Sequence, residues 1–387
     1  MTLPALSTQL DLTDEQRAIR DLARDLCESE VKPHAAEWDR TCEFPYDVVA
    51  RMGDLGFFGL SISPEYGGSG GDFTSLCLAI EELSRGDTSV GITLEAAVGL
   101  GISPIYNFGT EAQKQKYLPD LCAGRRLWAF GLTDPDSGTD AGHPKTHARQ
   151  EGDEYVINGA KAFITNSGTD ISWGVTVAAT TGEPGSRHVS AILVEKGTAG
   201  YEIEPPYRKL GWHASDTHGL VFDDCRVPRE NLLGEEGHGY AQFLATLEPG
   251  RIAIGALSVG LAQACLDASV EFAENRYSFG LPINRHEAIR FKLADMAVDL
   301  HLARLAVYHA ARLLDAGKPC RLEAAAAKLF ASEASKRAAD HAVQIHGGTG
   351  FMEESPVARY WRDVKINEIG EGTSEVQRML IAKHLVG

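Results

Sequence analysis

The pattern of hydrophobic and polar positions divides the chain into two helical parts with a different texture between them. In the first third, an apolar stripe at helical spacing runs from Ile19 to Leu26, and similar stretches cover residues 76–84 and 94–102. Apolar residues that recur every three or four positions form one face of an amphipathic helix. We therefore predict an N-terminal α-helical domain over residues 1–126.

Short segments rich in valine, isoleucine, threonine and aromatic residues replace the helical pattern from residue 127 onward. They cover residues 155–157, 162–165, 174–178, 190–194 and 219–222. Segments of this length, separated by Gly, Asp and Asn, are typical of a compact antiparallel β-domain, and the pair Asn158-Gly159 predicts a tight turn. We predict a middle β-barrel-like domain over residues 127–232.

Long alanine-rich stretches with a helical period return in the last part of the chain, at residues 251–276, 286–316 and 322–345. Helices of this length with more than one apolar face pack against one another as a bundle. Thr373 and Ser374 supply N-cap chemistry for a further short helix. We predict a C-terminal α-helical bundle domain over residues 233–387.

The composition is that of an ordinary globular protein with an acidic balance. A total of 37 Lys and Arg against 54 Asp and Glu gives a formal net charge of −17, which disfavours nucleic acid and anionic membranes as partners. The seven cysteines include no Cys-x-x-Cys pair, so we expect neither a disulfide framework nor a metal site. Asp11, Asp14 and Glu15 stand where a signal peptide would be apolar or basic, and we predict a cytoplasmic protein.

Glu371 is the residue of greatest chemical interest, because it stands between Gly370 and Gly372 immediately before a predicted helix. The two glycines leave the acid unshielded and let the backbone turn sharply or approach a flat ligand. The helix dipole would favour the carboxylate and an apolar cavity would oppose it, so the pKa of Glu371 can be tuned. The alternative for this sequence is a solvated turn between two helices.

Two stretches at the start of the β-domain carry groups that suit a flat heterocyclic ligand. The loop 130–140 offers Leu132 for the face of such a ring, with hydroxyls and backbone amides for its polar edge. In the segment 161–166, the ring of Phe163 can stack on an aromatic ligand while Thr165 bonds near its edge. The alternatives are an Asp/Gly turn cluster for the loop and a core aromatic residue for Phe163.

Several ordered motifs resemble those of the acyl-CoA dehydrogenase family, over essentially the whole chain. The run Ile-Gly-Glu-Gly-Thr-Ser-Glu-Val-Gln-Arg at 369–378, with Tyr-Trp-Arg-Asp at 360–363, resembles the C-terminal signature of that family. The loop 130–140 resembles the flavin-edge sequence Leu-Thr-Glu-Pro-x-x-Gly-Ser-Asp, with Asp for Glu and Thr for Ser, and 161–166 resembles Lys-x-[Trp/Phe]-Ile-Thr-Asn. The resemblance implies an α+β multidomain fold with an N-terminal helical domain, a middle β-domain and a C-terminal four-helix bundle.

The same resemblance implies that the protein binds FAD. The contacts that it implies at the flavin end are Phe130, Leu132, Thr133, Thr139, Phe163, Ile164 and Thr165. The run Arg-Tyr-Ser-Phe-Gly at 276–280 resembles a diphosphate contact of the family, in which a guanidinium can bind phosphate bidentately. The further cofactor contacts, some of them across a subunit boundary, are Arg276, Ser278, Phe279, Gln344, Gly347, Gly348, Thr373 and Glu375. The two glycines after the helix also suit a plain helix C-cap.

By this resemblance, Glu371 is the base that removes the α-proton of an acyl-CoA thioester. The β-hydrogen would leave as hydride to FAD N5, the product would be the trans-2-enoyl-CoA, and an electron-transfer flavoprotein would reoxidise the flavin. The implied substrate contacts are Thr139, Glu248, Gly250, Arg251, Gly370 and Gly372. Gly250 stands where some members carry their catalytic Glu. Because members that act on straight chains often have Tyr at the position of Gly370, we expect branched or cyclic acyl groups to fit.

The resemblance also implies a homotetramer built as a dimer of dimers, and it leaves two rival functions. An acyl-CoA oxidase uses the same base but passes electrons to oxygen, and the lack of an added C-terminal domain favours the dehydrogenase. A flavin-bearing DNA-binding or scaffold protein is the rival outside enzymes. The net charge of −17 and the presence of Glu371 argue against it.

Overall fold

The computed structural model describes residues 11–183 and 186–386, which fold as a helical part, a sheet and a second helical part. The N-terminal helices are α1 (Asp14–Leu26), α2 (Ala35–Thr41), α3 (Tyr46–Asp54), α4 (Phe73–Gly86), α5 (Thr88–Glu95), α6 (Ser103–Phe108) and α7 (Glu111–Cys122). A π-helical stretch, Ala96–Ile102, joins α5 to α6. Helix α1 begins with a capping box, in which Thr13 and Gln16 each bond the backbone of the other at 3.1 Å.

The middle part is an eight-stranded sheet in the order β6-β7-β3-β2-β4-β5-β8, with β1 paired to β4. The strands are β1 (Leu127–Gly131), β2 (His147–Glu151), β3 (Glu154–Thr165), β4 (Ser172–Thr180), β5 (Val189–Glu195), β6 (Tyr201–Ile203), β7 (Thr217–Pro228) and β8 (Leu232–Leu233). The prediction of an antiparallel domain is correct for most pairs, but β4 runs parallel to β1 and, at one position, to β2. Parallel neighbours need a long connection, and here β2 and β3 lie between β1 and β4 in the chain.

Asn158-Gly159 is not the tight turn that its sequence predicts, because it lies inside β3 at a shift in the register with β7. Asn158 accepts a hydrogen bond from the N–H of Asp224 at 2.9 Å and donates one to its carboxylate at 3.1 Å. A Cβ on residue 159, whose φ is 139°, would lie 2.6 Å from the Cα of Thr146. The glycine therefore serves a β-bulge with close backbone approach, and the β2–β3 turn lies at 152–153 instead.

The C-terminal part consists of long helices and one short hairpin. Its elements are α8 (Gly239–Asn275), β9 (Tyr277–Ser278), β10 (Leu281–Pro282), α9 (Glu287–Asp315), α10 (Arg321–His346), α11 (Pro356–Asp363) and α12 (Ser374–Val386). The stretch predicted at 251–276 is the later part of a longer helix, since α8 begins at Gly239 and contains Pro249 in its interior. The proline removes one helical N–H, but α8 is buried along much of its length, and tertiary packing supplies most of the stability of a protein helix.

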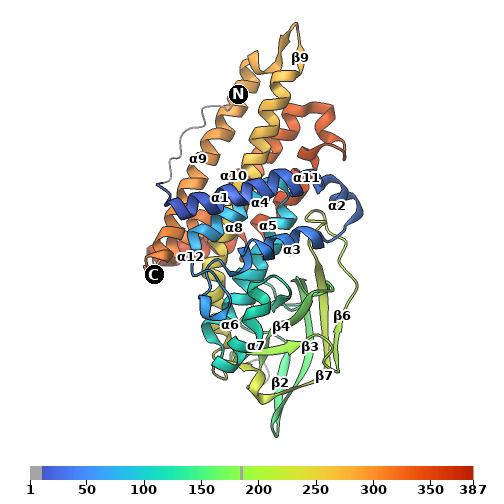
Figure 1. Cartoon of the computed structure of the whole chain (residues 1–387), viewed down its shortest axis with the longest axis vertical. Coiled ribbons are helices and arrows are strands. Elements are labelled where there is room, and N and C mark those ends of the chain that lie inside the picture. Colours follow the sequence, from blue (N-terminus) through green and yellow to red (C-terminus); the bar gives the residue numbers. More distant parts are fainter. Residues whose placement is uncertain (1–10, 184–185, 387) are drawn as a thin grey trace.

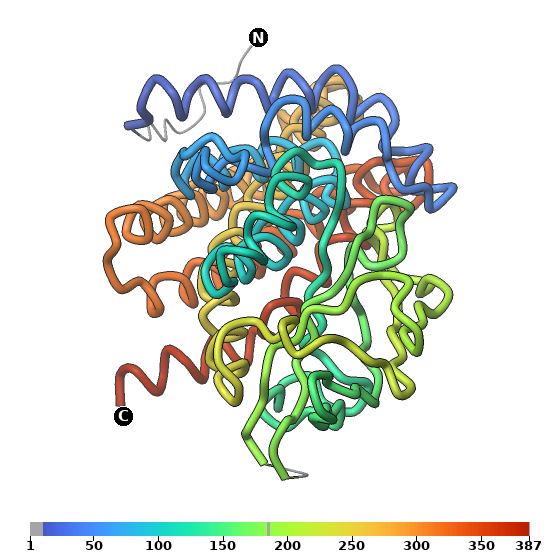
Figure 2. The backbone as a smooth tube through the Cα atoms, turned by 60° about the horizontal axis from the view of Figure 1, so that its bottom comes forward, coloured from blue at the N-terminus to red at the C-terminus, as the bar shows by residue number. Residues whose placement is uncertain are grey.

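One hydrophobic cluster joins the two helical parts, and the sheet has a cluster of its own. Helix α4 packs against α1, α8 and α9, while α8 also packs against α10. Figure 1 shows the long helices of the C-terminal part at one end of the molecule, the sheet with α6 and α7 beside it at the other, and α1 to α5 across the middle. In Figure 2 the C-terminal helix α12 extends away from the helical body.

Two helical stretches, Thr88–Phe108 and Gly239–Asn275, are long and apolar enough to cross a membrane. A helix that is apolar on all sides is either a core helix or a membrane span. The buried shares of their most apolar windows are 83% and 78%, which identifies both stretches as core helices of this fold.

Candidate active site

Glu371 lies in the turn between the 3₁₀ segment Val364–Glu368 and α12, with a backbone φ of 53°. Both of its carboxyl oxygens are buried, and neither has a hydrogen-bond partner among the residues that the structure describes. Burial raises the pKa of Glu371 to about 7, against the opposing effects of Glu95, Lys328 and Arg251. A solvated turn is therefore the wrong description of this side chain, and its pKa is that of a tuned base.

Two side chains from neighbouring helices hold this turn. Lys328 on α10 donates to the carbonyl oxygen of Gly372 at 2.8 Å. Gln377 on α12 donates to the same oxygen at 2.9 Å and to the carbonyl of Glu371 at 3.3 Å. Lys328 is fully buried, and burial lowers its pKa to about 8 although Glu371 favours its charged form. Neither residue was predicted as part of the site. The signal for Lys328 is a single lysine within an alanine-rich helical stretch, because a lysine buried in a helix core needs a partner.

Helix α8 brings Gly250 and Arg251 to the same place. A Cβ on residue 250 would lie 2.9 Å from the carboxyl carbon of Glu371 and closer still to its Oε2, so the missing side chain makes room for the acid. Arg251 is buried with an Nε that has no partner among the described residues, and burial lowers its pKa. Glu248, the third residue predicted here, pairs with Arg321 at 3.2 Å instead.

The N-terminus of α12 behaves as the sequence predicts. The hydroxyl of Thr373 accepts a hydrogen bond from the N–H of Val376 at 3.3 Å, which is an N-cap contact. Ser374 is the first residue of α12 and is buried, with an Oγ that has no partner among the described residues. Glu375 is exposed in the first turn of the helix. The capped helix thus fixes the residue that follows the Gly-Glu-Gly turn.

The two segments predicted for the flavin end lie side by side, since the N–H of Ala162 donates to the carbonyl of Thr133 at 2.9 Å. Thr133 is half-buried and Thr139 is exposed. The ring of Phe130 packs against Phe243 with centroids 4.6 Å apart. The ring of Phe130 therefore contributes to the packing of α8 on the sheet.

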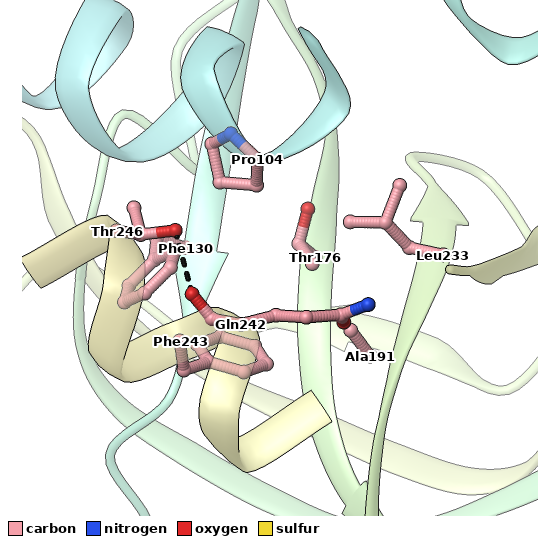
Figure 3. Close-up of a pocket in the computed structure, with 8 residues that line it drawn as sticks. All are labelled: Pro104, Phe130, Thr176, Ala191, Leu233, Gln242, Phe243 and Thr246. Atoms are coloured by element: carbon pink, nitrogen blue, oxygen red, sulfur yellow. Dashed lines mark hydrogen bonds between the residues drawn. The ribbon is translucent and has the colours of Figure 1, made fainter. Parts of the chain in front are cut away.

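Figure 3 shows a small gap between α8 and the sheet, which that aromatic pair helps to line. Thr246 donates to the carbonyl of Gln242 at 2.9 Å across one side of it. The residues that line it are Pro104, Phe130, Thr176, Ala191, Leu233, Gln242, Phe243 and Thr246. The gap has no room for a water molecule and is not a ligand site.

Asp134 does not point to a ligand, because the loop itself uses its carboxylate. Buried Lys161 forms an ion pair with it, and the backbone N–H groups of Lys145 and Thr146 donate to it at 2.6 and 2.9 Å. Burial lowers the pKa of Lys161 to about 8, although Asp134 favours the charged form. For this carboxylate the turn-cluster alternative is correct, and its network gives the loop a fixed shape next to the strand.

Phe163 is an exposed and strained residue rather than a core aromatic. Its φ is 62°, it lies where the register of β3 with β7 shifts, and 66% of its surface is exposed. Its ring centroid lies 5.3 Å from that of Tyr207. The neighbouring Ile164 packs in the core of the sheet and Leu132 is also largely buried. Positive φ at a bulky residue is costly and is concentrated at functional sites, so the bulge presents this ring outward.

A second cavity, of about 460 Å³, joins the two motifs that follow α8 and α10. Its lining consists of Phe272, Arg276, Ser278, Ile283, His286, Ile289, Ile345, His346, Gly347, Gly348 and Thr349. Gly347 is also the C-cap of α10, with a φ of 59°. The glycine therefore ends the helix and lines the cavity at the same time. Gln344 is exposed and does not line this cavity. Phe279, which follows Ser278 in the sequence, does not line it either and is 95% exposed.

Comparison with known proteins places this geometry in a family. The acyl-CoA dehydrogenase N-terminal, middle and C-terminal domain models match residues 13–125, 129–225 and 237–386. The chain belongs to the acyl-CoA dehydrogenase family. It is 49% identical over 376 residues to a probable acyl-CoA dehydrogenase, YngJ, of Bacillus subtilis, which covers 97% of this chain and 99% of the relative.

Two solved structures superpose closely. Butyryl-CoA dehydrogenase from Megasphaera elsdenii has a TM-score of 0.94 at 43% identity, covering 97% of this chain and 99% of that one. A chain in the structure of the electron transferring flavoprotein of Acidaminococcus fermentans has a TM-score of 0.95 at 42% identity, covering 98% and 99%. The predicted fold class and the predicted enzyme class, an acyl-CoA dehydrogenase, are thereby confirmed.

Proposed function

We propose that Glu371 is the catalytic base of this acyl-CoA dehydrogenase. It removes the α-proton of the acyl thioester while the β-hydrogen leaves as hydride, and the product is the trans-2-enoyl-CoA. The observation that carries this proposal is the buried carboxyl of Glu371, whose oxygens have no partner among the described residues. With its pKa raised by burial to about 7, the group is partly ionised at neutral pH and still has a high proton affinity.

The backbone of the same residue supports a second role. The N–H of Glu371 donates no hydrogen bond to any of the residues described in the structure, while Lys328 and Gln377 fix the turn from the carbonyl side. Negative charge develops on the thioester oxygen as the α-proton leaves. A fixed, unengaged N–H next to the base is suited to stabilise that charge.

The cofactor of the reaction is FAD, which supplies the hydride acceptor when it is bound. The cavity of about 460 Å³ offers a guanidinium, a hydroxyl and two bare glycines to a diphosphate, from Arg276, Ser278, Gly347 and Gly348. The outward ring of Phe163, on a strained bulge, is the surface on which an aromatic ring system would stack. These residue types fit the two ends of the cofactor.

The enzyme assembles as a homotetramer, a dimer of dimers. Exposed apolar residues follow one another on α9 at helical spacing: Phe291, Val298, Leu302 and Leu305. Further large apolar residues lie exposed in the segments around the cavity, namely Phe279, Phe351 and Met352. Apolar surfaces of this kind mark protein interfaces. Light scattering on the FAD-loaded protein tests the state, and a monomer that retains FAD would contradict it.

The substrate is a short acyl-CoA, and the acceptor is an electron-transfer flavoprotein. The likeness to butyryl-CoA dehydrogenase supports the first statement, and the chain from the electron transferring flavoprotein structure supports the second. A Cβ at position 370 would have one described neighbour within 4 Å, the carbonyl oxygen of Ile366 at 3.5 Å. Because Gly370 leaves this space open, we also expect branched short chains to be accepted. Activity on straight but not on branched four- and five-carbon esters would overturn the inference from Gly370.

The test of the base is the substitution Glu371→Gln, which keeps the shape of the side chain and removes its basicity. The variant should bind FAD and acyl-CoA, and flavin reduction in a single turnover should slow by at least about 10²-fold, the lower end for a general base. Glu368→Gln is the control, because it makes the same change three residues before Glu371. The carboxylate of Glu368 pairs with Lys365 at 2.6 Å instead of standing alone. Reduction of the Glu371→Gln flavin at the wild-type rate would assign the base to another residue.

A further inference from the structure

Glu95 is an acid in the helical core that has no counter-charge among the residues of the described ranges. It is the last residue of α5, where the π-helical stretch Ala96–Ile102 begins, and its exposed fraction is 0%. Both of its carboxyl oxygens are buried without a hydrogen-bond partner among the described residues. π-helical turns are rare and are frequent at functional sites. A buried acid of this kind needs an explanation.

The carboxyl of Glu95 lies beside that of Glu371, and each of the two groups therefore shifts the pKa of the other. A helical glycine gives each carboxyl its space. A Cβ on Gly99 would lie 2.8 Å from Oε1 of Glu95, just as a Cβ on Gly250 would overlap the carboxyl of Glu371. A glycine thus lies next to each of the two acids, and their four carboxyl oxygens have no other hydrogen-bond partner in the part of the chain that the structure describes.

The cations near this pair act on Glu371 only. Lys328 on α10 and Arg251 on α8 both favour its ionised form. The pKa of Glu95 is raised well above its usual value by burial and, further, by Glu371. Because nothing among the described residues stabilises a charge on Glu95, its neutral form is favoured. When the pair holds a single proton, that proton therefore belongs to Glu95.

We propose that Glu95 is a positioning residue of the dehydrogenation: as a neutral carboxylic acid, it donates a hydrogen bond to the carboxylate of Glu371 and stabilises the ionised base. The proposal deepens the role given to Glu371 above and rests on it. A hydrogen bond from Glu95 satisfies oxygens on both acids, and it orients the carboxylate while water is excluded. Glu95 acts through Glu371 and transfers no proton to substrate.

The first test is the pH dependence of kcat/KM of the FAD-loaded enzyme with butyryl-CoA. In the wild type we expect the rate to rise through one ionisation near pH 7, as the base in the free enzyme loses its proton. Glu95→Gln keeps an N–H donor for Glu371, so its midpoint should stay close to that of the wild type. Glu95→Leu removes the donor, and its midpoint should move upward by about one to two pH units. Glu368→Gln is the control for the loss of a nearby acid and should leave the midpoint in place.

Two results would overturn the proposal: a Glu95→Leu midpoint at the wild-type value, or equal shifts in Glu95→Leu and Glu95→Gln. Should Glu95→Leu fail to fold, infrared spectra of the wild type and of Glu95→Gln decide the matter. A protonated-acid band present only in the wild type is expected, and a carboxylate band in its place would refute the neutral acid. A wild-type enzyme that is inactive on every acyl-CoA would instead refute the proposed function. The infrared spectra do not depend on activity, so they would still report whether Glu95 is protonated.

Discussion

Replacing Gly250 by alanine separates the stability of α8 from the position of the base. The residue lies in the interior of the helix, where alanine is favoured over glycine by about 0.5–1 kcal/mol. Yet the added Cβ would lie 2.9 Å from the carboxyl carbon of Glu371, and carbon atoms are normally separated by about 3.5–4.0 Å. The carboxyl must therefore retreat by about 1 Å or rotate away.

A displacement of about 1 Å in a catalytic group costs about 10²-fold in rate. We expect Gly250→Ala to reduce its flavin about 10²-fold more slowly than the wild type, with a stability within about 1 kcal/mol of it. The assays are stopped-flow reduction under saturating butyryl-CoA and thermal unfolding of the FAD-loaded enzyme. If the flavin of Gly250→Ala is reduced at the wild-type rate, the statement that Gly250 makes room for the carboxyl of Glu371 is refuted.

Gly255→Ala is the matched control, because it makes the same change one and a half turns later on α8. Its Cβ would lie 2.8 Å from Cγ2 of Val307, a core contact away from Glu371. Overpacking of this kind costs about 1–3 kcal/mol. The control should therefore lose stability and keep its rate, the reverse of the behaviour expected for Gly250→Ala.

Three further predictions concern the cofactor, the pH dependence and the loop of the β-domain. Arg276→Ala should raise the dissociation constant of FAD by about 10- to 100-fold, since a charge-assisted hydrogen bond contributes about 1.5–3 kcal/mol; equilibrium dialysis measures it, and unchanged retention would contradict the contact. Because the pKa of Glu371 is raised to about 7, kcat/KM should fall as the pH drops below 7 and the base takes up its proton, and a flat profile between pH 5 and 8 would exclude this assignment. Asp134→Ala leaves the buried charge of Lys161 unpaired and should destabilise the fold by about 3–5 kcal/mol in denaturant unfolding, whereas a wild-type midpoint would show that the ion pair contributes little.

Periodicity along the chain determined the three-part organisation. Hydrophobic spacing is a local property, so the helices near 286–316 and 322–345 and the segments of β4 and β5 could be predicted from the sequence with bounds close to those observed. The motif around Glu371 could be located for the same reason, since two glycines and an N-cap lie next to it in the chain. The domain boundaries at 126/127 and 232/233 remain predictions of the sequence.

Local signals failed where a distant contact outweighs them. Asn158-Gly159 is a turn sequence, but Thr146 and the backbone of Asp224 lie against it and make it a bulge in a long strand. Pro249 marks a helix boundary by its chemistry, but the surrounding core holds α8 in one piece through it. Both outcomes depend on residues far away in sequence, which no local pattern contains.

The chemistry of Glu371, the proposed base, was decided in the same way. The sequence identified Glu371, but its pKa depends on groups from three other helices: Glu95 on α5, Arg251 on α8 and Lys328 on α10. In the sequence each of these is an isolated charged residue in an apolar stretch. A pKa is set by burial and by charges within a few ångströms, and only the folded chain brings a second acid, two cations and a glycine around one carboxyl.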